Sequence, residues 1–324
     1  MNNHSSATDD SGPPILPPGL RWGTLGVLAF SLTVPLTRVA VTGGLSPVFT
    51  GTGRAVVAGV LAGAVLLSTG QFRRLPRARQ WLRLSLVTGG VVVGFPVCTS
   101  LALQDVPAVH GAVVIAALPA ATAVVTVLRT GERAGTRFWC AAALGAVAAA
   151  TAGVLHNGGT GGALHAADLL LLAAVATGAV GYAEGGLLSR DLGSWQTICW
   201  ALVLGLPVMT VLAVASAPDF RAGWADWAAA DTEAWAAFAY LSVVSMFLGF
   251  FAWYRGLALG PMLQVSQVQL IQPLLSIAWA ALLLREHVTV PTMLSGLLVI
   301  ACAATAVRAR NTPSRSHPDM KGQP

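Results

Sequence analysis

The chain has 324 residues, of which 55% are hydrophobic and only 10% are charged. A soluble globular protein needs more polar residues than this to cover its surface, so the composition excludes that class. The net charge is +6 at pH 7. We attribute this positive charge to membrane topology and not to nucleic-acid binding.

Ten apolar runs are close to the length of about 20 residues that a helix needs to cross roughly 30 Å of hydrocarbon. In chain order, the predicted spans are 21–42, 47–68, 84–103, 107–128, 137–155, 167–188, 195–216, 235–254, 262–284 and 290–308. The sequence therefore predicts an all-α integral membrane protein with ten transmembrane helices. Segment 1–20 is expected to be a disordered cytoplasmic tail, and segment 309–324 a second cytoplasmic tail.

The orientation follows from the basic residues, because Arg and Lys near span ends stay on the cytoplasmic side. With the N-terminus inside, fifteen of the 19 Lys and Arg residues fall on the inner side, and only Arg221 and Arg285 fall on the outer side. Arg38 and Arg54 lie within spans. The sequence predicts a multi-pass protein of the cell (inner) membrane with both termini cytoplasmic.

The two halves of the chain carry the same arrangement, shifted by 154 residues: Pro107, Pro119 and Glu132 recur as Pro261, Pro273 and Glu286. Five predicted spans precede the glycine-rich linker 156–166 and five follow it. An odd number of spans in each copy inverts the second copy in the membrane. We therefore expect two inverted five-helix repeats, 21–155 and 167–308.

The repeated Pro…Glu segments, the run GTGRAVVAGVLAG around Arg54 and the run FAWYRGLALG around Trp253 resemble the EamA family of the drug/metabolite transporter superfamily. The resemblance covers the chain from Trp22 to Val307. In that family each repeat typically has an arginine in its second helix, and a proline and a glutamate frame its fourth. Arg54 matches this pattern, whereas the seventh span, with TICWALVLGLP, has no arginine. The resemblance implies secondary transport, commonly efflux of metabolites, amino acids or toxic compounds.

Two ionisable residues lie inside predicted spans, where a charge is costly unless it is paired or neutralised. Glu184 is interpreted either as a proton-coupling site or as an interfacial carboxylate paired with Arg190 or a neighbouring helix. Arg54 could bind a substrate carboxylate, neutralise an acid such as Glu184, or lock helices together through backbone carbonyls. The sequence leaves these alternatives open.

The first half of the ninth span is unusually polar. At about 100° per residue, Gln269, Gln272 and Ser276 share one narrow helical face, and Pro273 frees a backbone carbonyl near Gln269. These groups could contact a polar substrate or form hydrogen bonds between packed helices. Pro119, at the matching position of the first repeat, is expected to contribute only a helix kink.

Five further residues have two interpretations each. His110 is a candidate titrating group or an ordinary interfacial residue. Trp253 and Tyr254 end the eighth span and are candidates for a gate or aromatic wall, or for a membrane-interface belt. Glu132 and Glu286 stand at interhelical turns, where they are expected to cap a helix or to pair with a neighbouring arginine.

Together these features predict a secondary active transporter, a proton-coupled exporter of a small metabolite, amino acid or drug-like compound that works by alternating access. Common enzyme and ATPase motifs are absent from the sequence, so no catalytic residue, metal or cofactor is expected. The expected partners are a small-molecule substrate, protons and the lipid bilayer, and a homodimer is left open. The alternatives are a non-transporting membrane interaction protein and a membrane-embedded lipid-processing enzyme.

Overall fold

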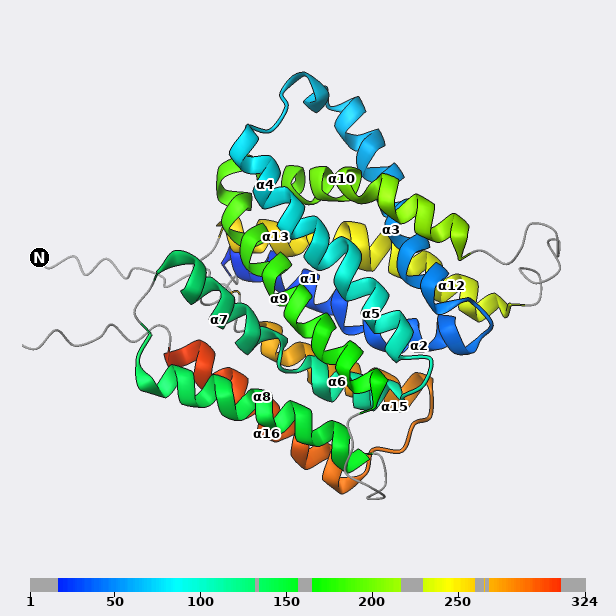
Figure 1. The fold of residues 1–324 in the computed structure, drawn as a ribbon, viewed down its shortest axis with the longest axis vertical. Coiled ribbons are helices and arrows are strands. Elements are labelled where there is room, and N and C mark those ends of the chain that lie inside the picture. The colour runs from blue at the N-terminus through cyan, green and yellow to red at the C-terminus, as the bar shows by residue number, and fades with distance from the viewer. Residues whose placement is uncertain are drawn as a thin grey trace, which may run out of the picture.

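The computed structural model describes residues 17–131, 134–156, 165–216, 230–259, 265 and 268–309. Within these ranges the chain forms helices and no strand (Figure 1), which confirms the all-α prediction for this part of the protein. Most of the two predicted tails and most of the predicted linker 156–166 lie outside the described residues. The predicted N-terminal tail 1–20 is too long at its end, because α1 already begins at Pro18, where a proline suits the first turn of a helix.

The described parts of both halves consist of helices. The first half contains α1 (Pro18–Ser31), α2 (Thr33–Thr42), α3 (Pro47–Ser68), the 3₁₀ helix η1 (Gln71–Arg73), α4 (Ala78–Val87), the π-helical η2 (Thr88–Gly94), α5 (Phe95–Ala102), α6 (Ala108–Ile115), α7 (Leu118–Thr130) and α8 (Thr136–His156). The second half contains α9 (Ala166–Leu192), α10 (Ser194–Ala215), α12 (Thr232–Tyr240), the π-helical η3 (Leu241–Leu248), α13 (Gly249–Leu259), the 3₁₀ helix η4 (Gln269–Ile271), α15 (Gln272–Leu283) and α16 (Val290–Ala309).

Seven helical segments of the described chain are long and apolar enough to cross a membrane. They are Pro18–Thr42, Pro47–Ser68, Ala78–Ala102, Ala108–Thr130, Ala166–Leu192, Ser194–Ala215 and Thr232–Leu259. Three shorter apolar helices, Thr136–Ala148, Gln269–Leu283 and Val290–Ala306, overlap the fifth, ninth and tenth predicted spans. The protein is thus a multi-pass membrane protein with at least the seven longer segments as candidate spans.

Helix starts in the two halves follow the repeat seen in the sequence. Four pairs of helices begin 154 residues apart: α4 and α12, α5 and α13, α7 and α15, and α8 and α16. The π-helical segments η2 and η3 occupy matching places in this series. By contrast, α9 and α10 begin 148 and 147 residues after α1 and α3. The difference in length between the halves therefore falls between α10 and α12.

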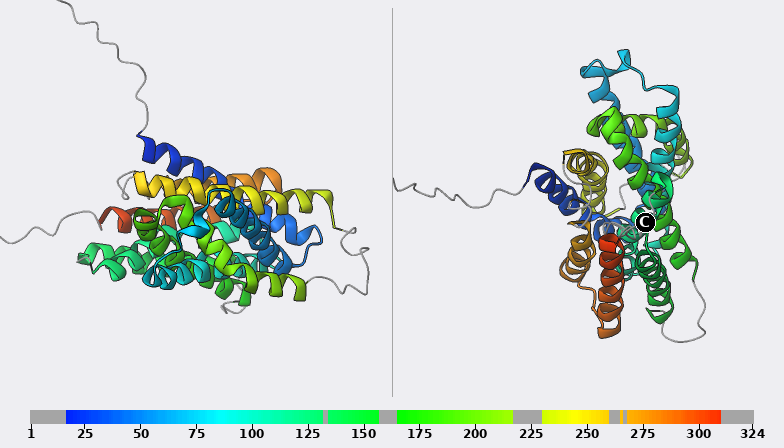
Figure 2. Two further views of the ribbon diagram at one scale, coloured as in Figure 1. Left: turned by 90° about the horizontal axis from the view of Figure 1, so that it is seen from above. Right: turned by 90° about the vertical axis from the view of Figure 1, so that its left-hand side faces the viewer.

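The helices of the two halves pack against each other in one bundle (Figures 1 and 2). The most extensive contacts join α3 to α10, α8 to α16, and α1 to α13, and α5 also packs on α9. In Figure 1, α8 and α16 lie side by side at the lower edge of the bundle. Each of these contacts pairs a helix of the first half with one of the second, so the interior of the bundle is formed by both halves.

The segment η2 crosses α9 at very close range because both carry glycine at the contact. A Cβ placed on Gly90 would lie 2.5 Å from the carbonyl oxygen of Thr177 and 2.7 Å from the nitrogen of Gly181. These are backbone atoms, which cannot move aside as the end of a flexible side chain can. Glycine at position 90 is therefore required by packing.

Replacing Gly90 with Ala is expected to destabilise the protein by about 1–3 kcal/mol, because overpacking at a backbone contact forces the helices apart. Gly89→Ala is the matched control, since nothing lies within 4 Å of a Cβ placed there. The thermal unfolding midpoint of the detergent-purified protein measures both changes. Equal midpoints for the two variants would show that η2 and α9 do not meet as closely as described.

Candidate functional site

Arg54 of α3 is the most deeply buried cation of the described chain, with 1% of its surface exposed. Its Nη1 lies 3.5 Å from Thr37 Oγ1 and its Nη2 lies 3.4 Å from Thr99 Oγ1, both longer than the usual 2.9–3.0 Å. Its Nε has no hydrogen-bond partner, and no carboxylate within the described ranges forms an ion pair with it. The guanidinium is thus a buried charge with weak neutral contacts.

Arg54 lines a cavity that we call the arginine cavity. About 430 Å³ of space, partly open at its edge, is free of protein atoms there. The cavity is lined by Phe30, Thr33, Val34, Arg54, Val91, Phe95, Pro96, Tyr182, Ser245, Met246, Phe250 and Gln272. These residues come from both halves, and both π-helical segments contribute to the wall. Because π-helical turns are frequent at functional sites, the presence of η2 and η3 in its wall favours this cavity as a functional site.

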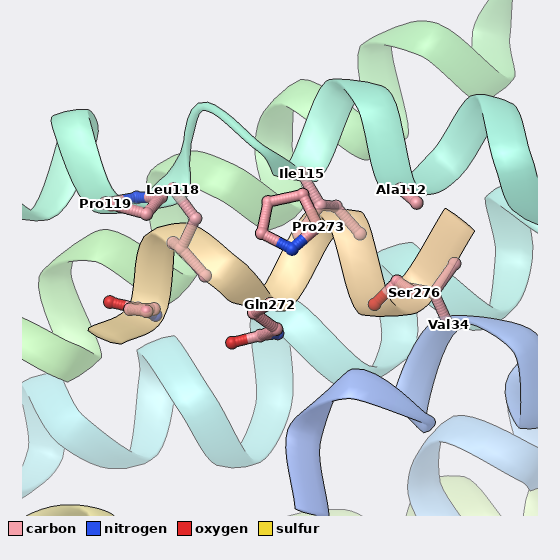
Figure 3. A pocket seen from close by; sticks show the side chains of 9 residues that line it. Val34, Ala112, Ile115, Leu118, Pro119, Gln272, Pro273 and Ser276 are labelled. Atoms are coloured by element: carbon pink, nitrogen blue, oxygen red, sulfur yellow. The ribbon is translucent and has the colours of Figure 1, made fainter. Parts of the chain in front are cut away.

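A neighbouring cavity, which we call the proline cavity, lies where two helices are interrupted (Figure 3). It has about 260 Å³ of free space, and its wall is formed by Val34, Ala112, Ile115, Leu118, Pro119, Gln269, Gln272, Pro273 and Ser276. Helix α6 gives way to α7 here, and η4 to α15; Pro119 and Pro273 stand in the first turns of α7 and α15. Broken helices facing a cavity are typical of membrane transport sites.

The polar face predicted for the ninth span lies in these cavities. Gln269 and Gln272 are buried, and the Nε2 of Gln269 and the Oε1 of Gln272 have no hydrogen-bond partner. Gln272 lines both cavities. Ser276 instead donates a 2.7 Å hydrogen bond to the carbonyl of Ser31, so it joins α15 to α1. The two amides are the members of this face that keep hydrogen-bonding capacity for a ligand.

Glu184 of α9 lies apart from Arg54, at the end of the bundle where α4 begins and α9 ends. Its carboxylate, 1% exposed, accepts a 2.9 Å hydrogen bond from Arg83 Nε and a second from Arg129 Nε. Arg83 also contacts Asp191 at 3.2 Å. We call these four residues the Glu184 cluster. It links α4, α7 and α9, and it lines neither cavity.

His110 of α6 pairs with an acid at the opposite end of α9. Its Nε2 lies 2.8 Å from Asp168 Oδ1, and both side chains are buried. The other oxygen of Asp168 accepts a hydrogen bond from the backbone nitrogen of His165 and so caps the first turn of α9. Sequence reasoning missed Asp168, although its place in the first turn of an apolar helix was a usable capping signal.

Trp253 and Tyr254 are enclosed by protein and not placed at the surface. The ring centroid of Trp253 lies 6.0 Å from Tyr182 and 6.4 Å from Phe30, and Tyr254 Oη donates to the carbonyl of Gly181 at 3.2 Å. Both residues therefore stand behind the aromatic wall of the arginine cavity, which they support without lining it.

Two other charged side chains satisfy helix ends. Glu286 accepts hydrogen bonds of 2.8 and 2.7 Å from the backbone nitrogens of Ala108 and Val109, at the start of α6. Arg38 donates to the carbonyls of Leu103 and Gln104 at 2.7 and 2.8 Å, just beyond the end of α5. Glu286 and Arg38 thus form hydrogen bonds with backbone groups near helix ends and stabilise the fold. Glu132, the repeat partner of Glu286, lies outside the described residues.

The apolar helices and the two cavities between them define a multi-pass membrane protein whose interior is formed by both halves and holds buried polar side chains. The model of the EamA-like transporter family matches residues 17–153 and again residues 165–308. The chain therefore belongs to the EamA-like transporter family, as its sequence resemblance predicted.

Two further comparisons agree with this assignment. A curated relative, "Uncharacterized transporter YdeK" of Bacillus subtilis (strain 168), is 43% identical over 286 residues, which cover 88% of this chain and 96% of the relative. A solved chain described as "Crystal structure of protein" superposes with a TM-score of 0.61 and 18% identity, covering 89% of this chain and 96% of the other. The latter similarity supports the fold alone.

Proposed function

We propose that this transporter is a proton-coupled secondary exporter of a small molecule, working by alternating access between two inverted five-helix repeats of ten transmembrane helices. The repeats are 21–155 and 167–308, and both termini are cytoplasmic, as the distribution of basic residues favours. The observation that carries the proposal is the arginine cavity, because its wall combines helices of both halves around a buried, weakly contacted charge.

A cavity between two similar halves suits alternating access. When the halves rock against each other, a site on their boundary is exposed first to one side and then to the other. Gln272 supports this arrangement because it belongs to the second half and lines both cavities, whereas Arg54 approaches from the first half. In the proposed cycle, Arg54, Gln269 and Gln272 contact the substrate.

Other side chains have supporting roles in this proposal. Ser276 fixes α15 against α1, and Trp253 and Tyr254 back the aromatic wall. His110 fastens α6 to α9 through Asp168 at the proposed outer end. Pro119 and Pro273 interrupt the helices beside the proline cavity.

The Glu184 cluster is the proposed coupling element. Glu184 holds Arg83 of α4 and Arg129 of α7 on either side of one carboxylate. A proton bound to Glu184 removes the negative charge between two cations and weakens all three helix contacts. Proton binding is thereby linked to separation of the helices at the proposed cytoplasmic end, since each event favours the other.

Proteoliposomes with an imposed pH gradient and an internal pH dye test the proposed function. Amino acids, organic acids and toxic cations are supplied one at a time, and protein-free liposomes are the control. We expect at least one compound to accelerate proton movement and to accumulate against its own gradient. If folded protein moves compounds only down their gradients, with no proton movement, the coupled mechanism is wrong.

A further inference from the structure

We propose that the arginine cavity selects organic monoanions, in which one carboxylate binds Arg54 and a compact apolar or aromatic body packs on the cavity wall. This inference rests on the proposed function, since it names the substrate class of the same site. Four observations support it: the state of Arg54, the charges around it, the shape of the wall and the position of Gln272.

The hydrogen-bond donors of Arg54 are incompletely used, so its guanidinium can still bind an anion. Its terminal nitrogens contact two threonine hydroxyls at 3.4 and 3.5 Å, and its Nε contacts nothing within hydrogen-bond distance. The hydroxyl hydrogens of Thr37 and Thr99 are directed to the carbonyls of Thr33 and Phe95 at 2.7 Å. A planar carboxylate can accept two short, charge-assisted hydrogen bonds from a guanidinium, which neither hydroxyl supplies.

The charge of the cavity matches a single negative group. Arg54 is the one charged residue among the described residues of its lining, which include no lysine, second arginine or acid. A phosphate monoester with two negative charges would leave one of them without a cation in an apolar site, which is costly. An amine would stand near Arg54 with no carboxylate beside it. A monoanion is therefore favoured over both.

The wall provides an apolar surface for the rest of the ligand. Phe30, Tyr182 and Phe250 form a continuous aromatic group, with ring centroids 4.9 Å apart for Phe30 and Phe250, and 5.7 Å apart for Tyr182 and Phe250. Aromatic walls of this kind bury apolar or aromatic bodies well.

Gln272 adds one directional contact on the side of the second half. Its Oε1 is buried without a partner in the wall of the same cavity, so it can accept a hydrogen bond from a hydroxyl or N–H group on the ligand. Arg54 and Gln272 belong to different halves. A ligand that contacts both therefore bridges the parts that move against each other in the proposed cycle.

Binding to the purified protein in lipid nanodiscs tests this selectivity. The probes are phenylacetate, 3-phenylpropionate and hexanoate, each with its uncharged amide and its amine analogue, and phenyl phosphate. We expect at least one carboxylate to bind about 10- to 100-fold more tightly than its amide, as hydrogen bonds to a charged group provide. If no carboxylate exceeds its amide, or if amines or phenyl phosphate bind best, the inference is wrong.

Variants identify the residue responsible. Arg54→Gln is expected to abolish the preference for the acid over the amide, and Arg54→Lys, which keeps the charge, should retain it with weaker binding. Arg38→Gln is the matched control, because Arg38 is occupied by backbone carbonyls and lines neither cavity; its preference should equal that of the wild type. An undiminished preference in folded Arg54→Gln protein would overturn the inference.

Transport measurements separate this inference from the proposed function. Selective binding of carboxylates without any movement across the membrane would contradict the transport mechanism and leave the carboxylate site intact. Proton-coupled movement of amines or neutral compounds alone would support the mechanism and overturn the carboxylate site.

Discussion

Replacing Arg54 with Met is expected to abolish transport and, in the absence of ligand, to raise the stability of the protein by about 1–3 kcal/mol, because it removes a buried charge without an acidic partner. Methionine fills a similar volume without that charge. For a protein of this size, the gain corresponds to a rise of a few degrees in the thermal unfolding midpoint, on the order of 2–4 °C per kcal/mol. Differential scanning fluorimetry of the detergent-purified variant measures it.

This result separates the two interpretations of Arg54. If Arg54 locks helices together, its replacement should lower stability. If Arg54 serves to bind a substrate, its replacement should abolish transport without lowering stability. Arg38→Met is the comparison, since Arg38 donates to two backbone carbonyls at 2.7 and 2.8 Å, and its loss should lower the midpoint. If both variants are destabilised alike, Arg54 has a structural role.

The second large effect is expected at Glu184. Glu184→Ala should destabilise the protein by about 1–3 kcal/mol, because it removes two charge-assisted hydrogen bonds that join α4, α7 and α9, although Arg129 is 45% exposed and Arg83 keeps its contact with Asp191. Glu184→Gln keeps the shape of the side chain but removes its charge. In proteoliposomes, this variant is expected to lose the pH dependence of transport while it still binds substrate.

Asp191→Asn is the matched control for Glu184. Asp191 also pairs with Arg83, at 3.2 Å, but 63% of its side chain is exposed, and exposed ion pairs contribute little to stability. Its replacement should change the unfolding midpoint by about a degree or less and leave the pH dependence unchanged. Normal pH dependence of transport in folded Glu184→Gln protein would exclude the coupling role.

Much of the helical organisation could be predicted from the sequence, because a membrane helix requires a long apolar run regardless of its neighbours. The predicted span 47–68 coincides with α3, and the 154-residue offset recurs in the starts of α7 and α15. The π-helical turns η2 and η3 could not be predicted in this way. They depend on how glycines such as Gly90 fit against another helix, and apolar patterning contains no information about that fit.

In the candidate site, too, some features could be predicted from the sequence and others could not. Arg54, Gln269 and Gln272 were candidates because polar groups within apolar runs stand out by type alone. Their neighbours were not predictable: sequence reasoning considered Arg54 and Glu184 as partners, whereas the structure pairs Glu184 with Arg83 and Arg129 and places Arg54 beside Thr37 and Thr99. The residues of each pair are between 17 and 101 positions apart in the chain.

By itself, the sequence determined the class of protein, its repeated organisation and its family, since all three depend on composition, spacing and local motifs. Only the tertiary structure decided which buried charge is neutralised and which is not. That distinction depends on packing between helices of both halves, which brings two arginines to Glu184 and no described acid to Arg54. Whether a buried charge is paired depends on residues from other helices, so it cannot be inferred from the sequence of one helix.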